Sequence, residues 1–317
     1  MKSKKIFLRL LLVFVISLVC FFLWLSFPGK GIEVTQLIPQ ETFTFLSLKI
    51  NSKDSGTSEL LNNFNWRIRW GVCLLGPVEI VALATPAISK EEPDYLFLVK
   101  NSRLIKIARL FRRSIDRAMI NGEPFERIEY RNCCILRLKG FGKEDEVSSY
   151  TLFKDVALAS NNLALLKSSL DQSGKETFFI PGEALSDFQE LQRAGEAMLF
   201  IDNSHSELSR IIKRLEKKIT YAILPTVDSL NYLGGYSDIL DADSLEGSLF
   251  FKYRETVDIE KGREDVYFLA GLLKRLCRAN GLNFEDEIIM DGHHLRLNFK
   301  LSGLKSLVSN LLAKGKK

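Results

Sequence analysis

An uninterrupted apolar run near the N-terminus constrains this chain more than any other feature. Four basic residues, Lys2, Lys4, Lys5 and Arg9, precede eighteen uncharged residues from Leu10 to Phe27. As a helix this run would be about 27 Å long, close to the hydrocarbon thickness of a bilayer. Pro28-Gly29 would then end the helix. The run therefore predicts a transmembrane helix with the bilayer as its partner.

A cleaved signal peptide is the alternative reading of the same run. It would need a shorter apolar core and a small-x-small cleavage site, which Leu25 to Lys30 does not supply. The residues before Cys20 are also unlike a lipoprotein processing site. The excess of basic residues before the run places the N-terminus in the cytoplasm. We therefore expect a single-pass bacterial inner-membrane protein whose C-terminal domain is periplasmic or otherwise extracytoplasmic.

The chain as a whole has the composition of a folded protein with a core. Of 317 residues, 46% are hydrophobic and 26% are charged, and the length favours two domains. We expect a cytoplasmic tip, transmembrane helix and linker over residues 1–34, and α+β units over residues 35–178 and 179–317. The 44 basic and 39 acidic side chains are spread along the chain, which argues against nucleic acid as a partner.

Alternating and helical hydrophobic patterns predict the elements of these units. In the first half, we expect strands near Thr42–Ile50, Glu79–Thr85, Tyr95–Lys100, Phe125–Arg131, Cys134–Lys139 and Ser149–Ala159. Helices are expected over Ser58–Trp70 and Leu104–Met119, and another opening at the N-cap residues Asn161-Asn162. In the second half, strands are expected over Ala197–Asp202, Leu245–Tyr253, Glu285–Met290 and His294–Leu301, with helices over Ser206–Ala222, Glu264–Arg278 and Leu304–Leu312.

The two halves follow a similar order of strands and helices. The predicted fold class is therefore α+β: an N-terminal transmembrane helix followed by two weakly repeated units of mainly antiparallel sheet with packed helices. The first half contains more strand-like segments than the second half can match. A single continuous sheet therefore stays open as an alternative.

Two segments resemble an uncharacterised bacterial family of single-anchor membrane proteins. Leu37-Ile38-Pro39-Gln40-Glu41-Thr42, which leads into the strand that begins at Phe43, is similar to that family's Leu-Pro-x-Asp-Thr-like start. The stretch from Val156 to Lys167 is similar to its strand-to-helix segment. Glu41 stands where the family usually has Asp, and one extra residue separates Leu37 from Pro39. The resemblance implies the topology and an α+β domain, without any catalytic residue.

The sequence contains no recognisable catalytic motif. Serine hydrolases need a Gly-x-Ser-x-Gly elbow, which does not occur, and Gly140 to Glu144 lacks the features of a P-loop. The histidines are His205, His293 and His294, and the adjacent pair would point to opposite faces of a strand. We therefore expect no catalytic residue, no metal site, no cofactor and no enzymatic activity.

Cysteines and aspartates provide two weaker candidates for chemistry. Cys73 and Cys277 could pair in an oxidising compartment, but buried free thiols are favoured for the cysteines outside the apolar run. Asp238, Asp241 and Asp243 supply oxygen ligands in one turn, although the glycine and late glutamate of an EF-hand loop are missing. A solvated turn is the favoured reading, and this turn is the first place to look for a bound ion.

Basic residues on two amphipathic segments form a candidate anionic-lipid surface. They are Arg103, Lys106, Arg109, Arg113 and Arg117 on one segment, and Arg210, Lys213, Arg214 and Lys217 on the other. Each set lies opposite an apolar stripe, so it could rest on lipid head groups. An ordinary solvated helix face is the alternative and the favoured reading.

These observations favour a non-enzymatic, membrane-anchored interaction or scaffold protein of the bacterial cell envelope. Its partner would be an envelope protein or a lipid. The alternative function is a lipid or apolar-ligand carrier at the membrane face, in which the phenylalanine-rich elements enclose a cavity. A hydrolase without a recognisable motif is a third, weaker hypothesis.

Overall fold

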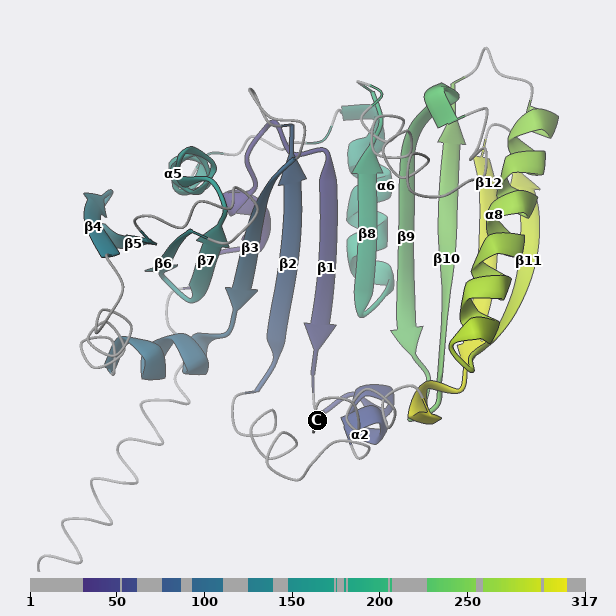
Figure 1. Ribbon diagram of the computed structural model, residues 1–317, viewed down its shortest axis with the longest axis horizontal. Coiled ribbons are helices and arrows are strands. Elements are labelled where there is room, and N and C mark those ends of the chain that lie inside the picture. The colour runs from purple at the N-terminus through teal and green to yellow at the C-terminus, as the bar shows by residue number, and fades with distance from the viewer. Residues whose placement is uncertain are drawn as a thin grey trace, which may run out of the picture.

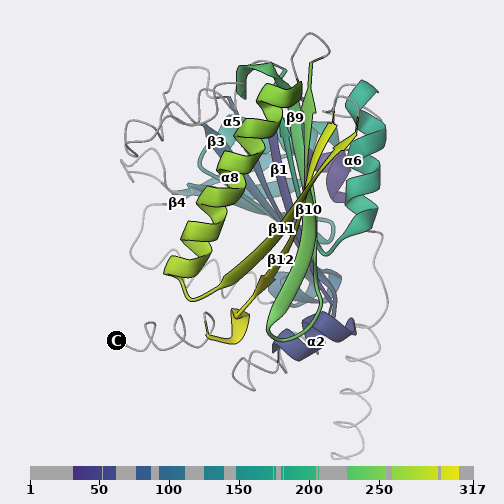
Figure 2. The same ribbon diagram turned by 90° about the vertical axis from the view of Figure 1, so that its right-hand side faces the viewer.

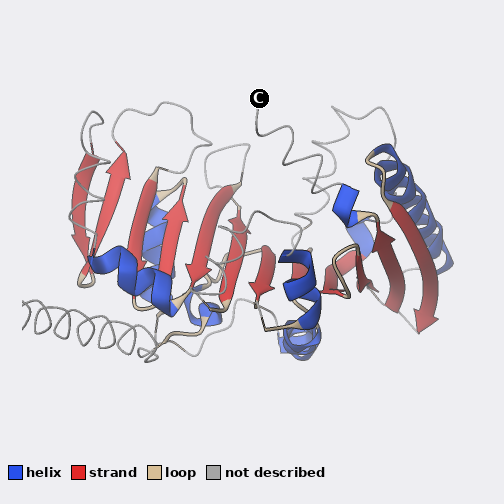
Figure 3. Cartoon of the chain, turned by 90° about the horizontal axis from the view of Figure 1, so that it is seen from below, coloured by secondary structure: helices blue, strands red, loops and turns tan. Residues whose placement is uncertain are grey.

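A single antiparallel sheet of twelve strands runs through the computed structural model (Figure 1). The strand order is β11-β12-β10-β9-β8-β1-β2-β3-β7-β6-β5-β4. The structure describes residues 31–51, 53–61, 76–86, 93–110, 125–138, 148–173, 175, 180, 182–204, 206, 227–254, 259–291 and 294–306. Figure 3, the view from below, shows the strands following one another across the molecule.

The strands are β1 (Thr44–Ile50), β2 (Val78–Thr85), β3 (Asp94–Lys100), β4 (Phe125–Tyr130), β5 (Cys133–Leu138), β6 (Ser149–Phe153), β7 (Val156–Ser160), β8 (Ala197–Asp202), β9 (Leu230–Ile239), β10 (Ser244–Tyr253), β11 (Asn283–Asp291) and β12 (His294–Ser302). The α-helices are α2 (Ser55–Leu61), α5 (Leu163–Gln172), α6 (Gly182–Ala194) and α8 (Ile259–Ala279), and residues 102–110 are also helical. The short 3-10 helices are η1 (Val34–Leu37) and η2 (Val227–Ser229).

Helices pack on both faces of the sheet, and α6 and α8 lie on opposite sides of it (Figure 2). Because side chains alternate along a strand, each strand in the middle contributes to both faces. On β10, Phe251 and Tyr253 belong to the core beneath α8, whereas Phe250 packs against the core on the α6 side. The sheet therefore separates two hydrophobic cores.

The larger core lies beneath α5, α6 and η1 and is built around aromatic rings. Phe188 of α6 makes edge-to-face contacts with Phe45 of β1 and Phe200 of β8, with ring centroids 5.2 and 5.4 Å apart. Phe200 also stacks on Tyr232 of β9 at 5.3 Å. Such geometries stabilise beyond the buried area alone. They fix α6 over the junction of β1, β8 and β9.

The smaller core lies beneath α8, which packs on β11 and β12. Val266 and Ala270 of α8 are buried against Leu295 and Leu297 of β12. Gly262 of α8 lies close to Tyr253, because a Cβ atom there would lie 2.8 Å from the ring. The absence of a side chain therefore allows α8 to approach the sheet.

The predicted fold class is wrong in its division into two repeated units. β1 of the first half pairs with β8 of the second half, from Thr44 opposite Ile201 to Leu48 opposite Ala197. This ladder makes the two halves one sheet, which was the open alternative. Periodicity predicts that a strand exists, but it does not predict which strand will pair with it.

The predicted fold class and localisation both included a transmembrane helix, and both are corrected on this point. No helix within the described residues is long and apolar enough to cross a bilayer. The described structure therefore does not support the predicted single-pass inner-membrane topology. Leu10 to Phe27, on which that prediction was based, lie outside the described residues.

Three elements were missed or merged in the sequence-based prediction. No strand was expected at β9, where Gly234 and Gly235 interrupt the alternating pattern. Gly234 lies beneath Leu191 of α6, because an added Cβ would be 2.6 Å from a Leu191 methyl group. No helix was expected at α6, and the strand expected over Ser149–Ala159 is a hairpin of β6 and β7.

Candidate functional site

Among the described residues, no helix packs on the apolar surface that the central strands present on the α8 side of the sheet. Two cross-strand rows form it: Leu199, Leu46, Ala82, Phe97 and Ala159, and beside them Ala197, Leu48, Ile80, Val99 and Ala157. We call these ten residues the apolar face. The exposed fraction is 47% for Leu46, 40% for Phe97 and 37% for Leu48. None of the ten side chains carries a charge.

A polar cleft lies on the other side of the sheet, between α6 and the strands β9, β10 and β12. It contains two adjoining cavities of about 310 and 560 Å³, which share Ala194, Tyr236 and Arg296 as lining residues. We call this region the Arg296 cleft. Its volumes lie within the range of small-molecule sites.

Arg296 is half-buried and is held in place entirely by uncharged groups among the described residues. Its Nε donates to Oδ1 of Asn298 at 2.7 Å and to Oγ of Ser248 at 3.3 Å. Its Nη2 donates to Oγ of Ser248 at 3.1 Å and to the hydroxyl of Tyr236 at 3.3 Å. The guanidinium also lies 5.1 Å from the ring centroid of Phe250, a cation–π distance. No described carboxylate forms an ion pair with it.

Tyr232 fixes the α6 wall of the cleft. Its hydroxyl donates a hydrogen bond to the carboxylate of Asp187 on α6. Burial raises the pKa of Tyr232, and the hydrogen bond to the Asp187 carboxylate raises it further, because both disfavour the phenolate. Tyr232 is therefore protonated at neutral pH and ties α6 to β9.

The basic residues predicted to face lipid are only partly described. Arg103, Lys106 and Arg109 lie on the helix of residues 102–110, while Arg113, Arg117, Arg210, Lys213, Arg214 and Lys217 lie outside the described residues. Arg109 donates to the backbone carbonyl of Lys154. On this helix Ile105 is buried and Leu104 is exposed. The lipid surface stays a prediction.

The aspartate turn is a hydrogen-bonded connection between β9 and β10. Asp241 accepts hydrogen bonds from the backbone nitrogens of Asp243 and Ser244, at 2.7 and 2.8 Å, and from the Ser244 hydroxyl at 2.8 Å. The bond from the Asp243 nitrogen is the largest cause of the lowered pKa of Asp241. Asp238 instead accepts from the nitrogen of Glu196. The described residues contain no group of three potential metal ligands.

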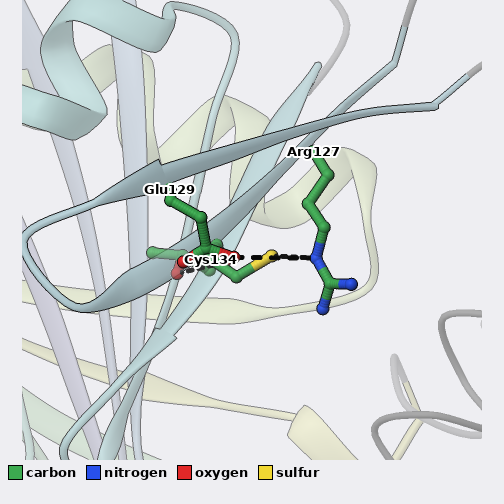
Figure 4. Close-up of polar contacts among 4 residues, drawn as sticks. Arg127, Glu129 and Cys134 are labelled. Atoms are coloured by element: carbon green, nitrogen blue, oxygen red, sulfur yellow. Dashed lines mark hydrogen bonds and ion pairs between the residues drawn. The ribbon is translucent and has the colours of Figure 1, made fainter.

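The described cysteines form no disulfide bond. Cys133 and Cys134 are buried in β5, and burial raises the pKa of the partly exposed Cys277. Across the β4–β5 hairpin, Nε of Arg127 lies 2.9 Å from Sγ of Cys134, and the guanidinium also approaches Glu129 at 3.8 Å (Figure 4). Cys73, the other half of the candidate pair, lies outside the described residues.

Sequence reasoning did not identify Arg296 or its cleft. In β12, His294, Arg296, Asn298 and Lys300 alternate with Leu295 and Leu297, a pattern typical of a strand with one solvated face. The missing information was that α6 borders the same side of the sheet. The only local signal was Phe250, an aromatic residue where the solvated face of β10 would have a polar one.

Comparisons with known proteins provide no family for this chain. No family model and no curated protein matches it. Among solved structures, crystal form III of TP0453 matches with a TM-score of 0.47 and 10% identity, covering 88% of this chain and 99% of that one. Crystal form I of TP0453 matches with a TM-score of 0.46 and 9% identity over 89% and 98% of the two chains. Since both TM-scores are below 0.5, neither likeness carries an argument about function. The resemblance to the uncharacterised family stays a prediction.

Proposed function

We propose that this protein is a non-enzymatic interaction or scaffold module that binds an amphipathic helix of a partner protein on its apolar face. The single observation that carries the proposal is the exposure of Leu46, Leu48 and Phe97 within two uncharged rows of neighbouring side chains. Contiguous apolar surfaces of this kind mark interaction sites more often than isolated exposed residues do. The cell-envelope setting rested on the corrected anchor, and the proposal does not depend on it.

The choice of a helix as the occupant follows from the neighbouring strands. On the same side of the sheet, α8 covers β11 and β12 by placing Val266 and Ala270 on Leu295 and Leu297. The apolar face continues this surface toward β1, β2 and β3. A second amphipathic helix would bury its apolar stripe there by the same packing.

The apolar-ligand carrier receives less support from the described residues. Phe45, Phe188 and Phe200 fill the core between α6 and the sheet instead of enclosing a space. The cleft that the described residues do form is bordered by Arg296 and several carboxylates. Such a lining does not suit a wholly apolar ligand.

Photo-crosslinking in the native cells tests the proposal. A photoreactive residue at Phe97 should form crosslinks to another protein, at a segment whose apolar residues recur at helical spacing. The matched control is the same residue at Leu276, which is 53% exposed on α8 but outside the apolar face. Crosslinks only to lipid, only to a second copy, or only to residues 203–226 of the same chain would each contradict the proposal.

A charge substitution provides an independent check on the same contact. Leu46→Lys should abolish the crosslink from position 97, because an ammonium group would have to be buried against the partner. Leu276→Lys should leave that crosslink unchanged. Equal crosslinking in both variants would show that the apolar face is not the binding surface.

A further inference from the structure

We infer that the Arg296 cleft is a binding site for a small monoanion with an apolar body, such as an alkyl or aryl carboxylate. This inference is independent of the apolar face, which lies on the other side of the sheet. It rests on the orientation of one guanidinium, the walls around it and the distribution of charge along the cleft.

The first step is that Arg296 is oriented without being neutralised. Asn298, Ser248 and Tyr236 accept its hydrogen bonds, and all three are uncharged. No described residue accepts a hydrogen bond from Nη1. A guanidinium that is partly removed from water and held in one orientation favours a carboxylate, because its donors match the two oxygens.

The second step is that an apolar wall adjoins this guanidinium. The cavity of about 310 Å³ is lined by Leu191, Tyr232, Tyr236 and Phe250 as well as Arg296. Phe250 stacks against Tyr236, with ring centroids 6.1 Å apart, and so extends this wall beneath Arg296. A ligand that places its head on Arg296 can therefore bury an alkyl or aryl body along the same wall.

The third step is that the surrounding charges limit the ligand to one negative charge. His294 lines the apolar cavity and contacts Lys252, while Asp187 and Glu190 lie on its α6 side. The adjoining cavity of about 560 Å³ is bordered by four carboxylates, Asp238, Glu246, Glu285 and Glu287, against Arg296 and Lys300. The carboxylate of Asp286 instead pairs with Lys274 of α8 on the other side of the sheet. A dianion on Arg296 would face the carboxylates that border the cavity, whereas a monoanion needs only the guanidinium.

Calorimetry on the full chain tests the inference with three probes that share one alkyl body. Octanoate should bind at least about tenfold more tightly than octanol, since a charge-assisted pair of hydrogen bonds corresponds to that ratio or more. Octyl phosphate, largely a dianion at pH 8, should bind more weakly than octanoate. Equal affinities for octanoate and octanol, or tighter binding of octyl phosphate, would overturn the inference.

Two variants assign the binding to the cleft. Arg296→Gln should reduce the preference for octanoate over octanol to less than about threefold, because the neutral amide cannot pair with the carboxylate. Arg275→Gln, at an exposed position on α8, is the matched control and should retain the wild-type preference. An unchanged preference in Arg296→Gln would contradict the assignment.

A steric variant keeps the test decisive if Arg296→Gln fails to fold. Ala194 borders both cavities but is exposed on the last turn of α6, so a large side chain there does not disturb the core. Ala194→Trp should block octanoate and octanol alike while the thermal unfolding midpoint stays unchanged. Undiminished octanoate binding in this variant would place the ligand elsewhere.

Discussion

The apolar face and the Arg296 cleft lie on opposite sides of the sheet and differ in the charge of their side chains. On β1, β2 and β3 the open side chains are uncharged and include Leu46, Ile80 and Phe97. On β10 and β12 the side chains that line the cleft are mostly polar, and Arg296 holds several of them by hydrogen bonds. The first surface suits a large apolar partner, and the second suits a small ligand with one charge.

The largest expected effect is the difference in stability loss between truncating a covered side chain and truncating an uncovered one. Phe188→Ala should lower the free energy of unfolding by about 3–5 kcal/mol, because the ring packs between Phe45 and Phe200 and its loss leaves a cavity. Leu46→Ala on the apolar face should cost less than about 1 kcal/mol. Urea unfolding at equilibrium measures both. Similar losses for the two variants would mean that the apolar face is already occupied.

The covering of the sheet by α8 can be tested with two glycines of the same helix. Gly262→Ala should destabilise by about 1–3 kcal/mol, because the added methyl group meets the ring of Tyr253 at 2.8 Å. Gly271→Ala should instead stabilise by up to about 1 kcal/mol, since an added Cβ would meet no atom within 4 Å apart from its chain neighbours and the backbone of its own helix, and alanine favours the helix. Thermal unfolding shows both changes. Stabilisation by both substitutions would mean that α8 does not pack closely on Tyr253.

The stabilisation that Tyr232 provides at the α6 wall of the Arg296 cleft should depend on pH. Tyr232→Phe should cost about 1 kcal/mol at pH 7, because Asp187 loses its donor. The pKa of Tyr232 is raised in the folded protein, so its stabilisation is complete below the unfolded pKa of about 10 and is lost as the pH rises above it.

Urea unfolding at pH 7 and pH 10.5 checks that the stabilisation by Tyr232 decreases as the pH rises. The difference between wild type and Tyr232→Phe should shrink at the higher pH. Leu276→Ala, at an exposed position on α8, removes no titratable group and should show no such change. A difference that grew with pH would show that Tyr232 does not donate to Asp187.

The smallest expected effect tests how exposed the apolar face is in solution. Leu46→Thr should change the free energy of unfolding by no more than about 0.5 kcal/mol, because threonine suits an exposed strand position. Leu98→Thr, on the covered side of β3, should cost about 2 kcal/mol or more, since Leu98 is fully buried. The urea midpoints of the two variants provide the comparison. A large loss in Leu46→Thr would indicate that this side chain is covered in solution.

Local patterns predicted many individual elements of this sheet. The strands expected over Glu285–Met290 and His294–Leu301 are confirmed as β11 and β12, and the alternation in β1 correctly indicated a strand. The predicted N-cap is confirmed, because Oδ1 of Asn162 accepts a hydrogen bond from the nitrogen of Ala164 at 2.8 Å. These features depend on residues that are close together in the sequence, so a single sequence contains them.

Features that depend on distant residues could not be predicted in this way. The pairing of β1 with β8 joins segments from opposite halves of the chain, and nothing in either strand specifies the partner. Gly234 looks like a strand breaker until Leu191 is placed above it. Arg296 looks like an ordinary solvated residue of β12 until Phe250 and α6 surround it. The candidate sites are assembled from such long-range contacts.

The junction of β1 and β8 also has a consequence for how the chain folds during synthesis. β1 gains β2 as a neighbour early, but its other edge pairs with a strand that emerges about 150 residues later. Until then this edge exposes unpaired backbone groups next to the uncharged side chains of Leu46 and Leu48. The nascent first half should therefore be prone to aggregation. This tendency should end once β8 has been synthesised and has paired with the free edge of β1.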